Sequence, residues 1–242
     1  VIDWDDEQIM EPKNPPSIVD KTSLKKDVNT DCSEIAKMLL AAERPLVIVG
    51  YGVKSSLQTE ALRNFIYLHK LPVSLTWPTA DFLSFDDVLN AGRFGVVAKR
   101  YANFVIQKSD LILVLGSRLD NIQTAFNIGR FGKNGRVLVV DIDPAELEKM
   151  PQSFTKYNYD LHDFVPALSF AMKEFEVPKN RNTWLKEIGN LRERFESESF
   201  KVGLEETGRI SIYDFVDKLS DGFSGDEIIV TGSSGLAIEV FY

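Results

Sequence analysis

Two glycines, Gly50 and Gly52, follow the apolar run PLVIV and are the first residues in this chain whose type and spacing could bind a ligand. A strand that opens into a Gly-x-Gly turn brings backbone N–H groups close to a phosphate in many nucleotide-binding α/β domains. The third glycine of a dinucleotide fingerprint is replaced by Ser55, and the next expected strand ends in SLTWP without an acidic residue. A redox NAD site is therefore not expected, whereas a nucleotide pocket with another purpose and a plain tight turn both remain open.

Charged residues follow two further apolar runs. In LGSRLDN, Arg118 could bind a phosphate bidentately or could pair with Asp120. In VVDIDPAEL, Asp143 suits the N-cap of a helix that begins at a proline, and Asp141 could accept a hydrogen bond from a ribose hydroxyl. Nothing near these two carboxylates supports a metal site.

Two glycine-containing segments also offer backbone N–H groups. Gly92 and Gly95 lead into a predicted helix and could cradle a ligand, or they could form a flexible connecting loop. The segment VTGSSGLA, residues 230–237, reads as a strand–turn–helix junction that would suit a phosphate or diphosphate, or a simple helix cap.

Composition excludes several classes of protein. A net charge of −8 argues against non-specific nucleic-acid binding, and no run of about 18 apolar residues encodes a membrane span. The single cysteine, Cys32, cannot form an internal disulfide and is expected to be structural. His69 and His162 stand far apart without motif context, so neither a catalytic residue nor a metal ligand is assigned. Cytoplasmic residence is the default expectation.

The elements that must position these residues alternate regularly. Apolar runs of strand length are expected at residues 45–50, 71–76, 110–116, 135–143 and, more weakly, 154–160. Helical periodicity occupies residues 33–43 (with Asp31 or Ser33 as N-cap), 57–70, 97–109, 144–149 and 161–175. This pattern predicts an α/β fold with a Rossmann-like parallel sheet covered by helices on both faces.

Composition also divides the chain into four parts. Residues 1–30 look like a strand end followed by a proline-interrupted linker, and residues 31–175 form the sheet domain. The highly charged residues 176–208 suit a surface helix or a connector. Residues 209–242 restart the pattern as helix, strand and glycine turn, so the chain is expected to be part of a longer protein.

The order of three segments is more specific than any single motif. RPLVIVGYGV, YANFVIQKSDLILVLGSRLDN and RVLVVDIDPAEL, at this spacing, resemble the central domain of thiamine-diphosphate-dependent enzymes of the acetolactate synthase type. The resemblance implies a middle domain of about six parallel strands at 31–175. Residues 1–30 would end a pyrimidine-binding domain, and 209–242 would be the truncated start of a pyrophosphate-binding domain.

The middle domain of that family holds FAD or ADP in some members and nothing in others. The cofactor contacts implied by the resemblance are Gly50, Gly52, Thr76, Trp77, Gly92, Gly95, Arg118, Asp120, Asp141, Ile142 and Asp160, with Gly232, Ser233 and Ser234 near the diphosphate of thiamine diphosphate. Two segments depart from the FAD-binding pattern. TWPTADF replaces a threonine-leucine-methionine-glycine loop, and Phe94 replaces a histidine.

The resemblance also implies an activity for the full-length protein. That protein would use thiamine diphosphate and Mg²⁺ to decarboxylate or ligate a 2-oxo acid, as a homodimer or homotetramer, and the present chain alone would be inactive. Two alternatives remain. One is a non-catalytic module that binds FAD or ADP. The other is a NAD-consuming deacylase, which needs a histidine at the carboxyl edge of the sheet, where neither His69 nor His162 is expected.

Overall fold

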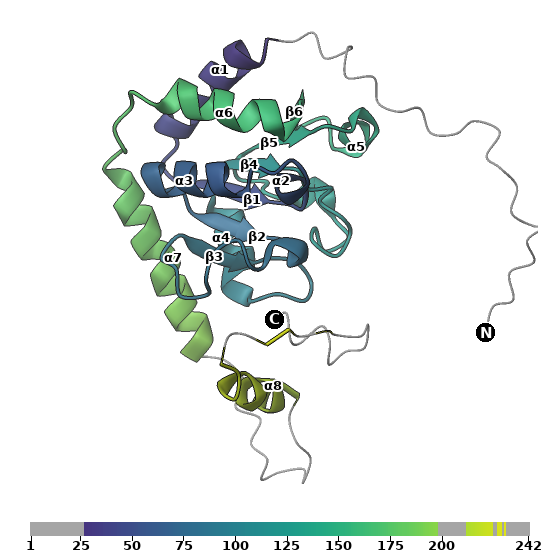
Figure 1. Cartoon of the computed structure of the whole chain (residues 1–242), viewed down its shortest axis with the longest axis vertical. Helices are drawn as coiled ribbons and strands as arrows, with labels where there is room; N and C mark the ends of the chain where they lie inside the picture. The colour runs from purple at the N-terminus through teal and green to yellow at the C-terminus, as the bar shows by residue number, and fades with distance from the viewer. Residues whose placement is uncertain (1–26, 198–211, 225–226, 229, 231–242) are drawn as a thin grey trace, which may run out of the picture.

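The computed structural model describes residues 27–197, 212–224, 227, 228 and 230 (Figure 1). Its sheet has six strands, which are β1 (Pro45–Val49), β2 (Val73–Leu75), β3 (Asn90–Arg93), β4 (Leu111–Leu115), β5 (Arg136–Asp141) and β6 (Thr155–Asn158). Every neighbouring pair is parallel, and the strand order is β3-β2-β1-β4-β5-β6. The predicted Rossmann-like α/β fold is confirmed.

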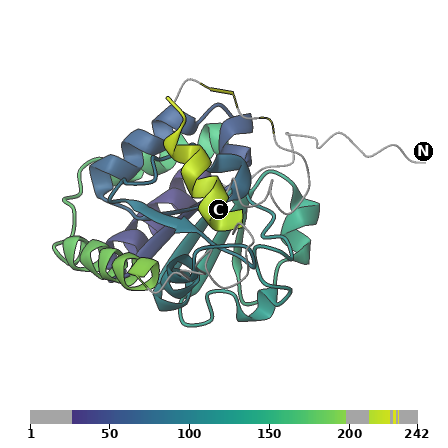
Figure 2. The same cartoon turned by 90° about the horizontal axis from the view of Figure 1, so that it is seen from below.

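Helices cover both faces of the sheet (Figure 2). The helices of the described residues are α1 (Val28–Ala41), α2 (Gly52–Ser55), α3 (Thr59–His69), α4 (Arg100–Lys108), α5 (Pro144–Lys149), α6 (Leu161–Met172), α7 (Asn180–Ser197) and α8 (Ile212–Asp221), with two 3₁₀ turns, η3 (Trp77–Thr79) and η4 (Ile128–Arg130). α1, α3 and α6 bury their apolar stripes in one hydrophobic cluster, and α4 and the first half of α7 do so in a second. The helix predicted before the last expected strand is α8.

The two central strands explain why the sheet is the core. All residues of β1 and β4 are buried, as expected for parallel strands covered on both faces. Successive side chains of a strand point to opposite faces. Val47 and Val49 therefore pack with α1, α3 and α6, whereas Leu46 and Ile48 pack with α4.

The edge strand β3 was not among the strands expected from apolar runs. Its sequence, NAGR, has no β-branched residue, and it pairs with β2 through an irregular register. The segment expected to lead directly into a helix is thus a short strand followed by a loop. A strand that lies at an edge and lacks large apolar side chains leaves no periodic signal.

Helix α1 begins earlier than expected. Its N-cap is Asp27, whose side chain accepts hydrogen bonds from the N–H of Asn29 and the hydroxyl of Thr30, so neither Asp31 nor Ser33 is the cap. Asp31 instead accepts a 2.6 Å hydrogen bond from the hydroxyl of Tyr159, and Ser33 donates to the carbonyl of Asn29. The N-cap differs from the expected residues because several side chains near this terminus are of types that can cap a helix.

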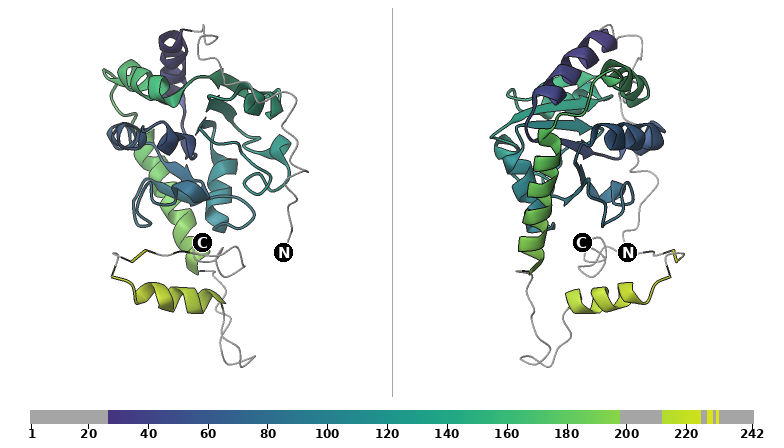
Figure 3. Two further views of the ribbon diagram at one scale, coloured as in Figure 1. Left: turned by 45° about the vertical axis from the view of Figure 1, so that its right-hand side comes forward. Right: turned by 90° about the vertical axis from the view of Figure 1, so that its left-hand side faces the viewer.

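Helix α7 lies along the edge at which the strands begin, opposite α2 and α5 (Figures 1 and 3). Residues 176–208 were expected to form a surface helix or a connector. Trp184 is nevertheless only 1% exposed, packs in the cluster beneath α4, and donates from its indole Nε1 to the carbonyl of Pro45 at 2.9 Å. Arg181 is equally buried and donates to the carbonyl of Leu39, so the start of α7 is part of the core.

Candidate functional site

The expected contact residues of the described chain lie at one edge of the sheet. Because all strands are parallel, their carboxyl ends meet at this edge, where ligands of open α/β sheets bind. The edge receives Gly50 and Gly52 after β1, Thr76 and Trp77 after β2, Gly92 and Gly95 from β3 and its loop, Arg118 and Asp120 after β4, Asp141 and Ile142 from the end of β5, and Asp160 after β6. Gly232, Ser233 and Ser234 lie outside the described residues.

The strand order reverses between β1 and β4, and at this point the two following loops are in direct contact. The N–H of Gly50 donates to the carbonyl of Leu115 at 2.9 Å, and the N–H of Gly52 donates to the carbonyl of Gly116 at 3.0 Å. The pairing of β1 with β4 therefore continues past the strands. At such a reversal, where ligands of open α/β sheets bind, the two loops are packed so closely that a Cβ on Gly50 would lie 2.2 Å from the Gly116 carbonyl oxygen.

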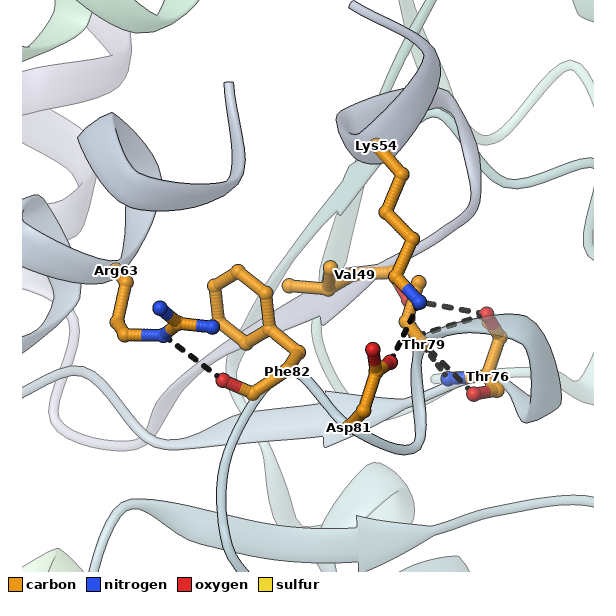
Figure 4. Close-up of polar contacts among 7 residues, drawn as sticks. All are labelled: Val49, Lys54, Arg63, Thr76, Thr79, Asp81 and Phe82. Carbon is orange, nitrogen blue, oxygen red and sulfur yellow. Dashed lines mark hydrogen bonds and ion pairs between the residues drawn. The ribbon is translucent and has the colours of Figure 1, made fainter. Parts of the chain in front are cut away.

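The loop after β2 is joined to β1 and α2 (Figure 4). The hydroxyls of Thr76 and Thr79 both lie within hydrogen-bonding distance of the Val49 carbonyl, at 3.1 and 2.8 Å. The ammonium group of Lys54 in α2 forms an ion pair with Asp81 at 2.5 Å. These contacts hold the TWPTADF segment against the end of β1.

Farther along the same loop, Phe82 is fixed to α3. Its carbonyl accepts from the Nε of Arg63 at 3.0 Å, and the Arg63 guanidinium lies over the Phe82 ring, 5.4 Å from its centroid (Figure 4). The Phe82 side chain is buried in the cluster under α1, α3 and α6. The segment thus has contacts to β1, α2 and α3, while Trp77 and Ala80 are half-buried and Pro78 is exposed.

The glycines near β3 are engaged with neighbouring side chains. The side-chain amide of Asn103 accepts from the N–H of Gly95 and donates to its carbonyl, each at 2.9 Å. The N–H of Gly92 donates to the side chain of Asn90, also at 2.9 Å. Phe94, which lies between the two glycines in the sequence, is buried and packs on Phe131 with ring centroids 5.7 Å apart, so its side chain belongs to the core.

Arg118 pairs across the edge and not with Asp120. Its side chain is 75% exposed, and its Nε lies 3.8 Å from the carboxylate of Glu146 in α5. Asp120 accepts from the backbone N–H groups of Ile122 and Gln123, both at 2.9 Å. The expected alternative of an Arg118–Asp120 pair is wrong, because the Asp120 carboxylate is used to cap its own turn.

The carboxylate of Asp141 is half-buried at the end of β5. Burial raises its pKa, and the charges of Asp143 and Glu146 act in the same direction, while the N–H of Asp143 and the charge of Arg118 oppose them. Asp143 is the N-cap of α5, as predicted, and accepts from the N–H of Ala145. An acidic strand end of this kind has the chemistry to accept from a hydroxyl, and no contact of this structure assigns it a ligand.

Two further polar groups begin α6. Asp160 is its N-cap and accepts from the N–H of His162 at 3.0 Å. His162 therefore stands in the first turn after β6, near the carboxyl edge, contrary to expectation, with its ring 71% exposed and paired with Asp163. Cys32, expected to be structural, is buried, and burial, with the charges of Asp31 and Asp27, raises the pKa of its thiol to about 12.

Several residues that shape the edge were not singled out from the sequence. Gly116, Thr79, Lys54 and Asn103 supply the contacts that join the loops. Gly116 follows an apolar run just as Gly50 does, which is a signal that could have identified it. The others carry no pattern, because their partners are distant in sequence.

Other features of the described residues lie elsewhere. A groove of about 690 Å³ runs beside α7 at the amino edge, lined by residues that include Tyr67, Lys70, Leu89 and Leu185. No three His, Cys, Asp or Glu side chains in the described ranges are arranged to hold a metal ion. Every helix in those ranges is too short or too polar to cross a bilayer.

Comparison with known proteins matches residues 32–168, more than half of the chain, to the central domain of thiamine pyrophosphate enzymes. The chain belongs to this family. The match covers the sheet from α1 to the middle of α6, so the edge described above is the carboxyl edge of a thiamine pyrophosphate enzyme central domain.

Curated relatives are acetolactate synthases. The large subunit of isozyme 2 from Escherichia coli (strain K12) is 29% identical over 165 residues, which cover 68% of this chain and 29% of that protein. Acetolactate synthase 1, chloroplastic, of Zea mays is 28% identical over 201 residues, which cover 82% of this chain and 30% of that protein. The acetolactate synthase large subunit from Lactococcus lactis subsp. lactis (strain IL1403) is 27% identical over 210 residues, which cover 85% of this chain and 34% of that protein. The chain thus spans 29 to 34% of the length of these relatives.

Proposed function

We propose that this chain is the central part of a longer enzyme of the acetolactate synthase type, which cleaves or forms a carbon–carbon bond beside the carbonyl of a 2-oxo acid. The observation that carries the proposal is the family match over residues 32–168, together with the three relatives described above, each of which is named an acetolactate synthase. The class of the whole enzyme is transferase or lyase.

Thiamine diphosphate, held with Mg²⁺, would supply the nucleophile and the electron sink of this chemistry. The residues proposed to approach its diphosphate from this chain are Gly232, Ser233 and Ser234. The whole protein is proposed to be cytoplasmic and to assemble as a homodimer or homotetramer. The 242-residue chain by itself is proposed to be inactive.

The central domain has an architectural role in the proposed enzyme. Two apolar clusters on either side of the sheet and the buried start of α7 at its amino edge support a rigid unit, because close-packed protein interiors have low compressibility and transmit strain. A rigid unit of this kind would fix the spacing between the domains that precede and follow it. The domain boundaries proposed for this chain remain 1–30, 31–175, 176–208 and 209–242.

The test compares the 242-residue chain with the same chain extended through its reading frame on both sides. Release of carbon dioxide from a panel of 2-oxo acids is measured with and without thiamine diphosphate and Mg²⁺. We expect cofactor-dependent release from the extended protein and none from the shorter chain. Cofactor-independent release, or an extended protein that releases no carbon dioxide from any 2-oxo acid, would contradict the proposal.

A further inference from the structure

Five glycine N–H groups of the carboxyl edge donate hydrogen bonds within the protein. The N–H groups of Gly50, Gly52 and Gly116 donate to carbonyls of the neighbouring strand or loop, at 2.9, 3.0 and 3.0 Å. Those of Gly92 and Gly95 donate to the side chains of Asn90 and Asn103. A phosphate is cradled by N–H groups that point at it and have no other partner, so these five cannot form a cradle without breaking internal hydrogen bonds.

The space that each of these glycines leaves is filled by protein. An ideal Cβ atom on Gly52 would lie 2.7 Å from the Cα of Gly116, and one on Gly92 would lie 2.7 Å from the Tyr101 hydroxyl. One on Gly95 would lie 2.8 Å from the carbonyl oxygen of Ile122. In a dinucleotide site one such glycine lets the backbone approach the pyrophosphate, whereas here the space beside each glycine is taken by another loop or, at Gly92, by a side chain of α4.

Three carboxylates and one hydroxyl of the edge also have hydrogen bonds within the protein, each carboxylate through one of its oxygens. Asp120, Asp141 and Asp160 each accept at least one backbone N–H, which closes a turn or starts a helix. The hydroxyl of Thr76 is directed to the carbonyl of Val49. The exposed guanidinium of Arg118 faces the carboxylate of Glu146, which would compete with a phosphate for it.

The helix after β1 is also short. In a dinucleotide fold the diphosphate sits at the N-terminus of this helix, where the dipoles of several aligned turns add. α2 has four residues and is followed by a break at Leu57, whose φ is 59°, before α3 begins. One turn supplies little of the dipole that favours an anion.

We propose that the carboxyl edge of this central domain is a closed rim and holds neither FAD nor ADP. Gly50, Gly52 and Gly95 allow neighbouring loops to pack closely against backbone, and Gly92 allows Tyr101 to pack against β3. The sequence departures at Trp77 and Phe94 fit this arrangement, because Phe94 is in the core and the loop that carries Trp77 is joined to β1 and α2. The domain is therefore held together without a bound nucleotide.

The test measures flavin and nucleotide binding directly and does not use turnover, so it can fail independently of the proposed function. The 242-residue chain and its extended form are incubated with FAD or ADP, passed over a gel-filtration column, and measured by absorbance and by thermal unfolding. An acetolactate synthase that carries FAD serves as the positive control. We expect no flavin in the protein fraction and unchanged unfolding midpoints, because only a ligand that binds the folded state raises the midpoint.

Two variants make the result specific. Gly52→Ala is expected to lower the unfolding midpoint by at least about 4 °C, by the same amount with and without FAD, because its Cβ meets backbone and not a ligand. Arg118→Ala is expected to leave both measurements unchanged. Stoichiometric flavin in the protein fraction, or a midpoint raised by FAD or ADP in the parent and lost in Arg118→Ala, would overturn the proposal.

Discussion

A Cβ atom on Gly50 would stand 2.2 Å from the carbonyl oxygen of Gly116. The two residues end the central strands β1 and β4, so the closest approach of the two loops lies at the reversal of strand order. Position 50 thus requires glycine because another part of the same chain packs against it. This contact makes the Gly-x-Gly turn a packing feature of the sheet.

Replacing Gly50 with alanine should therefore destabilise the fold. The added methyl group meets the backbone of Gly116 and the Cβ of Ser117, and relief requires the β1 and β4 loops to separate, so we expect a loss of about 1–3 kcal/mol or more in the free energy of unfolding. Urea denaturation monitored by circular dichroism measures it. Gly189→Ala is the matched control, since nothing lies within 4 Å of its Cβ position in α7, and a gain of about 0.5–1 kcal/mol is expected there. Equal effects of the two substitutions would contradict the account.

Helix α7 should contribute strongly to stability through Trp184. Removal of this buried side chain in Trp184→Ala is expected to cost about 3–5 kcal/mol, which urea denaturation would detect. Trp184→Phe should cost less, because it keeps most of the packing and loses the hydrogen bond to Pro45. Phe170→Ala in α6 is the control, since this ring is 77% exposed. If Trp184→Ala were no more harmful than Phe170→Ala, α7 would not be part of the core.

The sequence predicted the parts of the fold whose residues carry a local signal. β1 and β4 are continuous apolar runs, α3 and α4 have clear helical periodicity, and Pro144 marks the start of α5. The edge strand β3 was missed because it has no apolar run. Trp184 was not identified as core, because the charged residues around it dominate the composition of its helix while burial depends on what packs against one face.

The location of the candidate site residues could be predicted from the sequence, but the partners of their polar groups could not. Parallel topology places strand ends at one edge, so residues such as Gly50, Asp120 and Asp141 could be located there from the sequence. Whether their polar groups are available depends on partners far away in the chain. The Gly50 donor is matched by Leu115, and the pairing of Arg118 is with Glu146 instead of the nearby Asp120. Such long-range pairs leave no spacing that a single sequence reveals.

The thiol of Cys32 should be inert in the folded protein. It is fully buried, lies 3.7 Å from the carbonyl of Phe164, and has a pKa raised to about 12 by burial and by the nearby carboxylates. Thiolate is the reactive form, so alkylation by iodoacetamide at neutral pH should proceed only as fast as the chain unfolds. The same chain in guanidinium chloride is the control and should react at once. Rapid labelling of the folded protein would show that the α1–α6 contact opens readily.

His69 should make the fold less stable in acid. Burial lowers the pKa of its imidazole below the ordinary value of 6.5, with a further contribution from the charge of Arg181, and its Nε2 has no hydrogen-bond partner. Below pH 6.5 the unfolded chain thus binds a proton that the folded chain resists, and the stability due to neutral His69 is lost as the pH falls toward the folded pKa. The free energy of unfolding, measured by urea at a series of pH values, should therefore fall more steeply below pH 6.5 in the parent than in His69→Gln. His162→Gln, which replaces an exposed ring, should follow the parent profile. A His69→Gln profile parallel to that of the parent would show that protonation of this ring does not oppose folding.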